Sequence, residues 1–326
     1  NIKRGITMSG YLTDIEGIKI GHAQDYEAGT GCTVILCPKG AIGGVDVRGG
    51  APGTRETDLM APENLVEKVN AIYLSGGSAF GLDGASGVMQ YLSENGIGFD
   101  TGAVKVPIVP AAVIFDLDVG NPMKRPDFNM GYEACINATE KDFDLGNVGA
   151  GTGATVGKYF GNEFSMKGGL GTYLIQIGEL KVGALAVVNA LGDVIDPETG
   201  NILAGALNKT KTDFINTVNA IRSGLILGNN PSIANTTIGA VATNARLSKA
   251  AGHKVASMAH DGLARAIRPV HTMFDGDTVF CLSIGDIKAE PSIVGILAAE
   301  AMAEAIISGI KNAEPMYGRI SFKSFK

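Results

Sequence analysis

The residue with the clearest chemical potential is Thr236, which follows Asn235 in the stretch SIANTTIG (232–239). Ser, Asn and Thr favour turns and a strand-like run comes next, so one interpretation is a plain junction between a loop and a strand. The other interpretation is a latent nucleophile. A threonine hydroxyl is weak until a base takes its proton, and an N-terminal amine, with a pKa of about 7.7–8.0, can be that base. Thr236 acquires such an amine only if its bond to Asn235 is broken.

The Thr236 hydroxyl could break that bond itself, by attacking the preceding carbonyl to form an ester that water then hydrolyses. The surrounding segment 223–237 is rich in Gly, Asn, Pro and Ser, and we expect it to be exposed. Cut ends in such a segment can relax without disturbing the core.

A pair of carboxylates could serve the same chemistry. In HTMFDGDTVF (271–280), Asp275 and Asp277 lie two residues apart, directly before a strand-like run. One interpretation is an ordinary Asp-Gly turn. The other is an anionic pair, in which two close negative charges raise the pKa of the first carboxyl unless a cation lies between them. The amine of a processed Thr236 would be such a cation.

The glycine-rich stretch GNVGAGTGATVGK (146–158) does not fit a nucleotide-binding loop. Thr152 stands where the P-loop pattern needs its first Gly, and Lys158 is followed by Tyr159 instead of Ser or Thr. The dinucleotide-binding pattern fits formally, but the charged segment before it is no buried strand. We interpret the stretch as a tight loop that lets Lys158 approach another group closely.

Cysteine and histidine spacing gives no sign of a metal or redox site. We expect neither a metal nor another cofactor, and the absence of a G-x-S-x-G elbow leaves a Ser-His-Asp triad unsupported. The cysteines are expected to be reduced core thiols, and the histidines to be ordinary packing or surface residues. These residues are Cys32, Cys37, Cys135 and Cys281, and His22, His253, His260 and His271.

Composition narrows the class of protein. The 326 residues are 45% hydrophobic and 18% charged, with 46 glycines, as in a compact globular chain. A net charge of −6 without a Lys/Arg cluster argues against nucleic acid as a partner. No apolar run reaches the roughly 18 residues of a membrane span, and residues 1–17 lack the apolar core of a signal peptide. We expect a cytoplasmic protein that binds no membrane.

Strand-like runs alternate with amphipathic helices along one domain, residues 1–326. The helix at 78–96 is expected to bury Phe80, Val88, Met89 and Leu92. The adjacent runs 171–180 and 181–192 have no helix between them and predict an antiparallel hairpin. Mixed strand pairs with helices on either side predict a layered α/β protein with a largely antiparallel core. The other predicted elements are strands at 32–37, 71–77, 237–245 and 277–283, and helices at 208–223, 249–267 and 291–310.

The stretch NTTIGAVATNARLSKAAGHKVASMAHDGLARAIRPVHTMFDGDTVF (235–280) resembles the start of the small subunit in the self-cleaving L-aminopeptidase/D-esterase family, which includes β-peptidyl aminopeptidases and nylon-oligomer endohydrolases. Five motifs fit its large subunit in order: GIKIGHA, GGVDVRGGAPGTRETDL, IYLSGGSAFGLDGASGV, VPIVPAAVIFDL and GNVGAGTGATVGK. The resemblance implies a four-layer αββα sandwich of the N-terminal-nucleophile type. It also implies a precursor cut into a large (1–235) and a small (236–326) subunit, assembled as a homo-oligomer such as four αβ units.

The same resemblance assigns roles to individual residues. Thr236 matches the nucleophile, and Asp275 with Asp277 matches the polar or acidic pair near it, in the form found in nylon-oligomer hydrolases. Asn189 matches an oxyanion-hole amide, a kind of donor worth about 10²–10³ in rate, and Lys158 matches a basic residue near the active centre.

Phe115 departs from the family pattern, because several relatives have a tyrosine there. A phenol that could donate a hydrogen bond is therefore missing, which bears on how a substrate is oriented.

Together these features predict an amide hydrolase that works through an acyl-enzyme on small peptides, amino-acid amides or esters, or 6-aminohexanoate oligomers. One alternative is an acyltransferase that resembles the ornithine acetyltransferase group, in which an amine accepts the acyl group in place of water. The other is an uncleaved, non-catalytic binding protein.

Overall fold

The computed structural model describes residues 6–224 and 235–325. The segment expected to be exposed, 223–237, lies mostly outside the described residues. Its last three residues, Asn235, Thr236 and Thr237, are buried, at 1%, 4% and 1% exposure. For them the prediction is wrong, because they already pair with the sheet.

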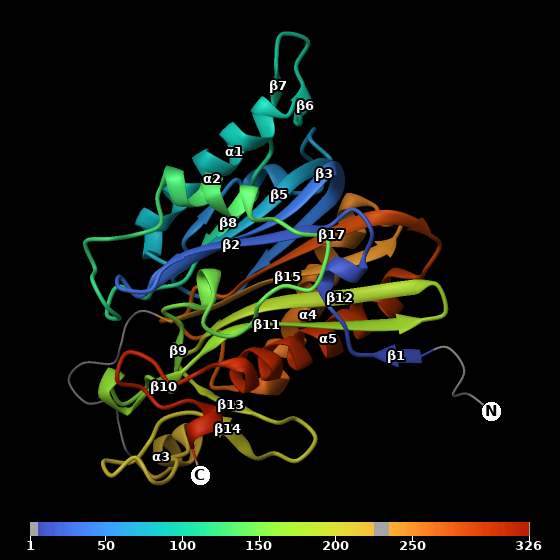
Figure 1. Cartoon of the computed structure of the whole chain (residues 1–326). Coiled ribbons are helices and arrows are strands. Elements are labelled where there is room, and N and C mark those ends of the chain that lie inside the picture. The colour runs from blue at the N-terminus through green and yellow to red at the C-terminus, as the bar shows by residue number, and fades with distance from the viewer. Residues whose placement is uncertain (1–5, 225–234, 326) are drawn as a thin grey trace.

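A ten-stranded sheet forms the centre of the molecule, and most of its neighbouring strands are antiparallel (Figure 1). Two neighbouring pairs, β15 with β17 and β5 with β8, are parallel. The predicted hairpin is confirmed as β11 and β12, joined by a turn at Gly178 and Glu179. In spatial order the strands are β1 (Ile6–Met8), β11 (Gly169–Ile177), β12 (Leu180–Asn189), β15 (Thr236–Ala245), β17 (Thr278–Ile287), β3 (Thr30–Val47), β5 (Lys68–Ser75), β8 (Ala111–Val113) and β4 (Thr54–Arg55), with β2 (Lys19–Asp25) also beside β3.

The long strand β3 turns this one sheet into two facing layers. Its first half, residues 32–36, pairs with β5, and its second half, residues 42–47, pairs with β17, with a register shift between Leu36 and Ala41. Apolar side chains from both halves fill the space between the layers, with Ile35 and Leu74 on one side and Phe280 on the other. The two sheets of the predicted sandwich are thus continuous through one strand.

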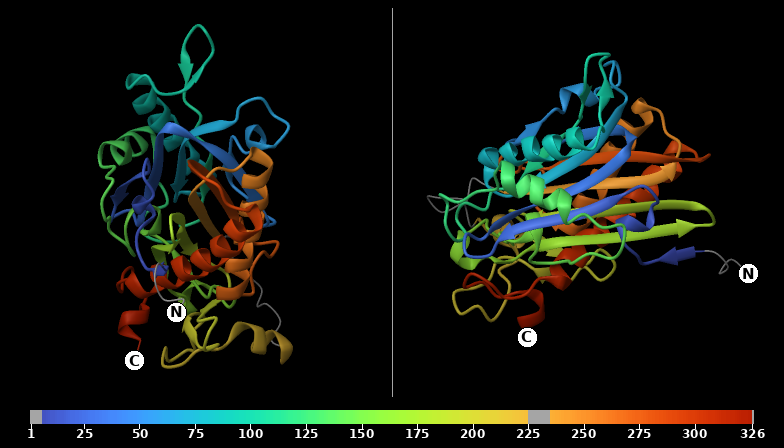
Figure 2. Two further views of the ribbon diagram at one scale, coloured as in Figure 1. Left: turned by 90° about the vertical axis from the view of Figure 1, so that its right-hand side faces the viewer. Right: turned by 45° about the horizontal axis from the view of Figure 1, so that its top comes forward.

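Helices cover the two outer faces (Figure 2). α1 (Gly84–Glu94) and α2 (Phe128–Ile136) pack on β2, β3 and β5, while α4 (Lys249–Ala266) and α5 (Pro291–Asn312) pack on β3, β11, β12, β15 and β17. Separate buried clusters lie under each helix pair and between the sheets. The predicted αββα layering is confirmed.

Shorter elements complete the described chain. The short strands are β6 (Phe99–Asp100), β7 (Lys105–Val106), β9 (Thr155–Val156), β10 (Met166–Lys167), β13 (Asp193–Ile195), β14 (Ile202–Ala204) and β16 (Ile267–Arg268). The short helices are α3 (Thr217–Arg222) and the 3-10 turns Leu12–Asp14, Asp58–Met60, Ser78–Asp83, Gly149–Gly151, Asn162–Phe164 and Phe322–Ser324.

The helix predicted at 208–223 is mostly wrong, since only α3 forms there. The Asn208 side chain accepts hydrogen bonds from the Thr212 amide and the Thr210 hydroxyl, both at 3.0 Å. Asn and Thr side chains that bond nearby backbone compete with helix formation, and here the competing turn forms.

Two other expectations need correction. Phe80 is 60% exposed, because residues 78–83 form a 3-10 turn that points its ring outward, under the Arg125 guanidinium at 4.0 Å. α5 is long and apolar enough to cross a membrane, contrary to the expected lack of such a run, but 72% of its apolar window is buried inside the protein. The four cysteines are buried and free, as expected.

Two glycines of α4 provide a matched test of the packing between α4 and α5. A Cβ at Gly262 would lie 2.3 Å from the Ala299 carbonyl oxygen, whereas one at Gly252 would meet nothing closer than 3.7 Å. We expect Gly262→Ala to lower the free energy of unfolding by about 1–3 kcal/mol. Gly252→Ala is expected to raise it by about 0.5–1 kcal/mol, because alanine restricts the unfolded chain. Urea unfolding of both variants checks this, and equal effects would contradict the close approach of the two helices at Gly262.

Candidate active site

Thr236 is the first residue of β15 and lies directly opposite Asn189, the last residue of β12. Directly opposed residues of an antiparallel pair present their side chains on the same face of the sheet. On the other side, β15 runs parallel to β17, with Ile238 beside Thr278. Parallel neighbours begin at the same edge, so the loop before β17, with Asp275 and Asp277, arrives beside Thr236.

The peptide bond between Asn235 and Thr236 is held by the backbone of this loop. The Gly276 N–H donates to the Asn235 carbonyl oxygen at 2.9 Å and also lies 3.2 Å from the Thr236 Oγ1. The Thr236 hydroxyl in turn contacts the same carbonyl oxygen. A Cβ at Gly276 would lie 2.8 Å from Thr236 Oγ1, so glycine permits this approach. The Gly276 N–H therefore lies within hydrogen-bond distance of both the Asn235 carbonyl oxygen and the Thr236 hydroxyl.

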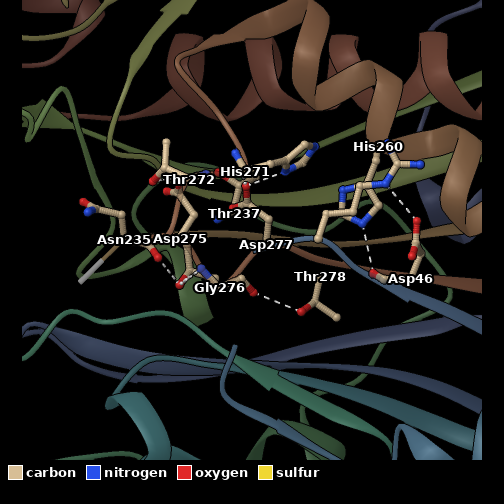
Figure 3. A network of polar contacts seen from close by, with 12 residues as sticks. Asp46, Asn235, Thr237, His260, His271, Thr272, Asp275, Gly276, Asp277 and Thr278 are labelled. Carbon is tan, nitrogen blue, oxygen red and sulfur yellow. Dashed lines mark hydrogen bonds and ion pairs between the residues drawn. The ribbon is translucent and has the colours of Figure 1, made fainter. Parts of the chain in front are cut away.

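The two carboxylates are buried, and their hydrogen bonds face different ways (Figure 3). Asp275 Oδ2 accepts from the Thr272 amide at 2.8 Å and the Thr272 hydroxyl at 2.6 Å. Asp277 Oδ1 accepts from the Thr237 amide at 2.7 Å. The Asp275 amide also donates to the Thr272 carbonyl at 3.2 Å, so the segment is both a turn and a buried carboxylate pair.

Burial raises the pKa of Asp275 to about 6, and the negative charge of Asp277 acts in the same direction. Hydrogen bonds from Thr272 and the positive charge of Lys158 oppose this rise. A carboxyl in that range changes charge close to neutral pH, and a nearby cation would draw it toward the ionised form.

Lys158 and Asn189 form a buried polar pair at 0% exposure each. The Lys158 ammonium donates to Asn189 Oδ1 at 2.9 Å and to the Asn189 carbonyl at 3.2 Å, and the Thr155 amide donates to the same Oδ1 at 3.0 Å. Because Oδ1 is occupied by donors, Asn189 Nδ2 must point the other way, where it donates to the Phe115 carbonyl at 3.0 Å. The close approach predicted for Lys158 is thus an approach to Asn189.

Burial also lowers the pKa of Lys158 to about 8, against the opposing attraction of Asp118 and Asp275. The charge on this lysine is therefore adjustable in the pH range where a hydrolase would work.

A cavity of about 300 Å³ opens at Thr236. Its described walls carry no charged side chain, so it suits an apolar group. The lining residues are Ala51, Pro52, Gly53, Ser78, Ala79, Val113, Ile114, Phe115, Asn235, Thr236 and Phe274. Phe115 therefore lies in the wall of a pocket beside Thr236, where it can bear on how a substrate is oriented.

The structure brings together all the residues singled out from the sequence, and it adds three. Gly276 and Thr272 belong to the same loop, and they are only visible as site residues once the loop is folded. The third is His271, for which the interpretation as a packing or surface residue is wrong. Its ring Nδ1 lies 2.7 Å from Asp277 Oδ2, from a loop position six residues earlier. Within residues 6–224 and 235–325, no cluster of three or more His, Cys, Asp or Glu could hold a metal ion.

The facing sheets and the outer helix pairs form a mixed α/β fold of the N-terminal-nucleophile hydrolase type. The L-aminopeptidase D-Ala-esterase/amidase of Ochrobactrum anthropi, described as a variant of that fold, superposes with a TM-score of 0.71 at 17% identity, over 95% of this chain and 89% of that one. At that identity the likeness concerns the fold.

Residues 10–323 match the model of peptidase family S58, and the chain belongs to that family. A relative from Mycobacterium bovis named as an uncharacterized aminopeptidase is 45% identical, over 94% of this chain and 95% of its own. The 6-aminohexanoate-oligomer endohydrolase of Kocuria sp. is 30% identical, over 91% of this chain and 85% of its own. The protein is thus a hydrolase of peptide or amide bonds.

The buried Lys158 should leave a signature in the pH dependence of stability. Its pKa is lower in the folded than in the unfolded chain, so the unfolded chain binds more protons between about pH 8 and 10.5 and stability rises with pH there. From pH 7.5 to 9.5 we expect wild type to gain about 2 kcal/mol of unfolding free energy over Lys158→Met. Urea unfolding at several pH values measures it. The exposed Lys141 is the control, since Lys141→Met should keep the wild-type slope, and a parallel curve for Lys158→Met would contradict the buried charge.

Proposed function

We propose that this protein is a self-processing hydrolase with an N-terminal threonine nucleophile, and that it cleaves amide bonds through an acyl-enzyme. One observation carries the proposal: the Gly276 N–H is shared between the Asn235 carbonyl and the Thr236 hydroxyl. Such a donor polarises the carbonyl next to a hydroxyl that already contacts it, which is the arrangement an internal attack needs.

Processing begins when Thr236 Oγ1 attacks the carbonyl carbon of Asn235. The Gly276 N–H then stabilises the negative charge that develops on the carbonyl oxygen. The C–N bond breaks, the hydroxyl proton ends on the leaving amine, and an ester joins Asn235 to the Thr236 side chain. Water hydrolyses this ester to give chains 1–235 and 236–326, the second with a free amine on Thr236.

Turnover uses the same atoms on a new carbonyl. The Thr236 amine takes the hydroxyl proton during attack and passes it to the leaving amine of the substrate. Asp275 and Asp277 hold the amine and offset its positive charge during transfer. Asn189 Nδ2, whose direction is set by Lys158, donates to the carbonyl of Phe115, a residue of the pocket wall, and in this proposal it supplies a donor for the oxyanion. Water then releases the acyl group from Thr236.

The pocket supports an aliphatic acyl group. Its wall beside Thr236 includes Pro52, Val113, Phe115 and Phe274, without a charged residue among the described lining. A 6-aminohexanoyl unit presents an uncharged chain of five methylenes at this position, and a small apolar aminoacyl group also fits about 300 Å³. We therefore place oligomeric aliphatic amides, as cleaved by the Kocuria relative, and apolar amino-acid amides among its substrates.

Removing the nucleophile tests the proposal directly. Thr236→Ala is expected to run as one full-length band on denaturing electrophoresis and to hydrolyse no amide, whereas Thr236→Ser should still be cut. The matched control is Thr237→Val, because the neighbouring Thr237 hydroxyl is buried and has no hydrogen-bond partner among the described residues. Thr237→Val should give two bands as wild type does. Two fragments from Thr236→Ala would mean that an external protease makes the cut.

The proposal also predicts the acid side of the pH profile. As pH falls, log kcat/KM should drop with a slope of one per pH unit as the Thr236 amine protonates. At a pH below 6 the slope should become two, because Asp275 is then protonated as well and no longer holds the amine. Burial raises the pKa of this carboxyl to about 6 in the uncut chain, and the ammonium of Thr236 lowers it from there. Asp275→Asn should show lower activity and a slope of one throughout. The control is Asp142→Asn at an exposed position, which should keep the wild-type pH profile. A slope of two that persists in Asp275→Asn would exclude this role for Asp275.

A further inference from the structure

One oxygen of the Asp277 carboxylate, Oδ2, accepts two hydrogen bonds from the same residue, His271. Oδ2 of Asp277 accepts from the His271 backbone amide at 3.1 Å and from the ring Nδ1–H at 2.7 Å. Because a carboxylate only accepts, the hydrogen of the ring is assigned to Nδ1. The other oxygen, Oδ1, is thereby turned to the Thr237 amide, one residue after the nucleophile. Figure 3 shows Asp277 between the two partners.

The His271 backbone adopts an uncommon conformation. Its φ of 55° lies in the left-handed region, which non-glycine residues enter at a free-energy cost and where Asn, Asp and His are enriched. In this conformation the amide and the ring of one residue both reach Asp277. A conformation of this kind persists only when the surrounding structure determines it.

Among the described residues, Asp277 is the polar partner of the His271 ring. His271 Nε2 is buried and has no hydrogen-bond partner among the described residues. The His260 ring packs edge-on against it, with centroids 4.8 Å apart and planes at 73°. His260 Nε2 donates to the Asp46 carbonyl at 2.9 Å, and burial lowers the His260 pKa to about 4, so this neighbour is neutral at pH 7. His260 therefore supports the His271 ring by packing and brings no second charge.

We propose that His271 is a positioning residue for Asp277. Its Nδ1–H fixes Oδ2, so that Oδ1 stays on the first residues of β15, where processing creates the amine of Thr236. The catalytic consequence rests on the proposed function, since Asp277 acts there by holding that amine. The geometric part, a donated Nδ1–H from His271 to Asp277, stands independently of it.

Two substitutions separate the donor from the backbone conformation. Glycine accepts the left-handed φ but has no side-chain donor, whereas asparagine accepts that φ and carries an amide nitrogen where histidine has Nδ1. In the processed enzyme we expect His271→Gly to lower kcat about 100-fold, with KM within about twofold, as for a misplaced reacting group. His271→Asn should recover at least tenfold of that loss. Thermal unfolding of both variants shows whether a difference in activity follows a difference in stability.

Equal kcat values for wild type, His271→Gly and His271→Asn would overturn the inference. A rise in KM with no change in kcat would overturn it as well. If His271→Gly does not fold, ¹⁵N NMR of histidine-labelled wild type decides. A proton on His271 Nδ1 supports the contact, and a proton on Nε2 alone overturns it. Failure of the proposed function is a separate result, because Thr236→Ala would then keep wild-type hydrolysis whatever His271 does.

Discussion

The site depends on how the start of β15 is fastened to the loop that enters β17. Two hydrogen bonds that flank Thr236 contribute to this: one from the Gly276 N–H to the Asn235 carbonyl, and one from the Thr237 amide to the Asp277 carboxylate. They lie on either side of Thr236, so this residue has little freedom to leave its place. The parallel pairing of β15 with β17 continues this arrangement into the sheet, and β12 secures the opposite edge through Asn189. A catalytic group held on strands is more exact in position than one on a free loop.

Burial sets the electrostatics of this place. The same loss of hydration raises the pKa of Asp275 to about 6 and lowers that of Lys158 to about 8. The two pKa shifts have opposite signs, but each favours the uncharged form of its group, because surroundings of low polarity disfavour charge of either sign. A hydrogen bond from the Thr272 amide to Asp275, and one from Lys158 to Asn189 Oδ1, limit the penalty for burying them. Buried groups that titrate near pH 7 are what acid–base chemistry on an amide requires.

Much of the layout could be predicted from residue pattern. The strands β15 and β17 begin within one residue of their predicted positions, since β-branched and apolar runs with turn residues before them mark strand starts well. The helix expected at 208–223 is mostly absent because Asn208 and its threonine neighbours satisfy each other locally. Phe80 is exposed, against expectation, because a periodic pattern does not distinguish a 3-10 turn from an α-helix. In both cases the deciding interaction is a side-chain contact that periodicity does not reveal.

By itself the sequence predicted the hydrolysis of amide bonds, through a family pattern that spans most of the chain, and it marked Thr236, Asp275 and Asp277 as candidate site residues. It also determined which runs become the strands that carry them. Only the tertiary structure decided which backbone N–H donates to the Asn235 carbonyl, in which direction Asn189 Nδ2 points, and that the His271 ring bonds Asp277. The reason is physical. Strand formation follows from neighbours along the chain, whereas these contacts join loops and strands from residues 115 to 277, and their directions exist only when the layers have packed.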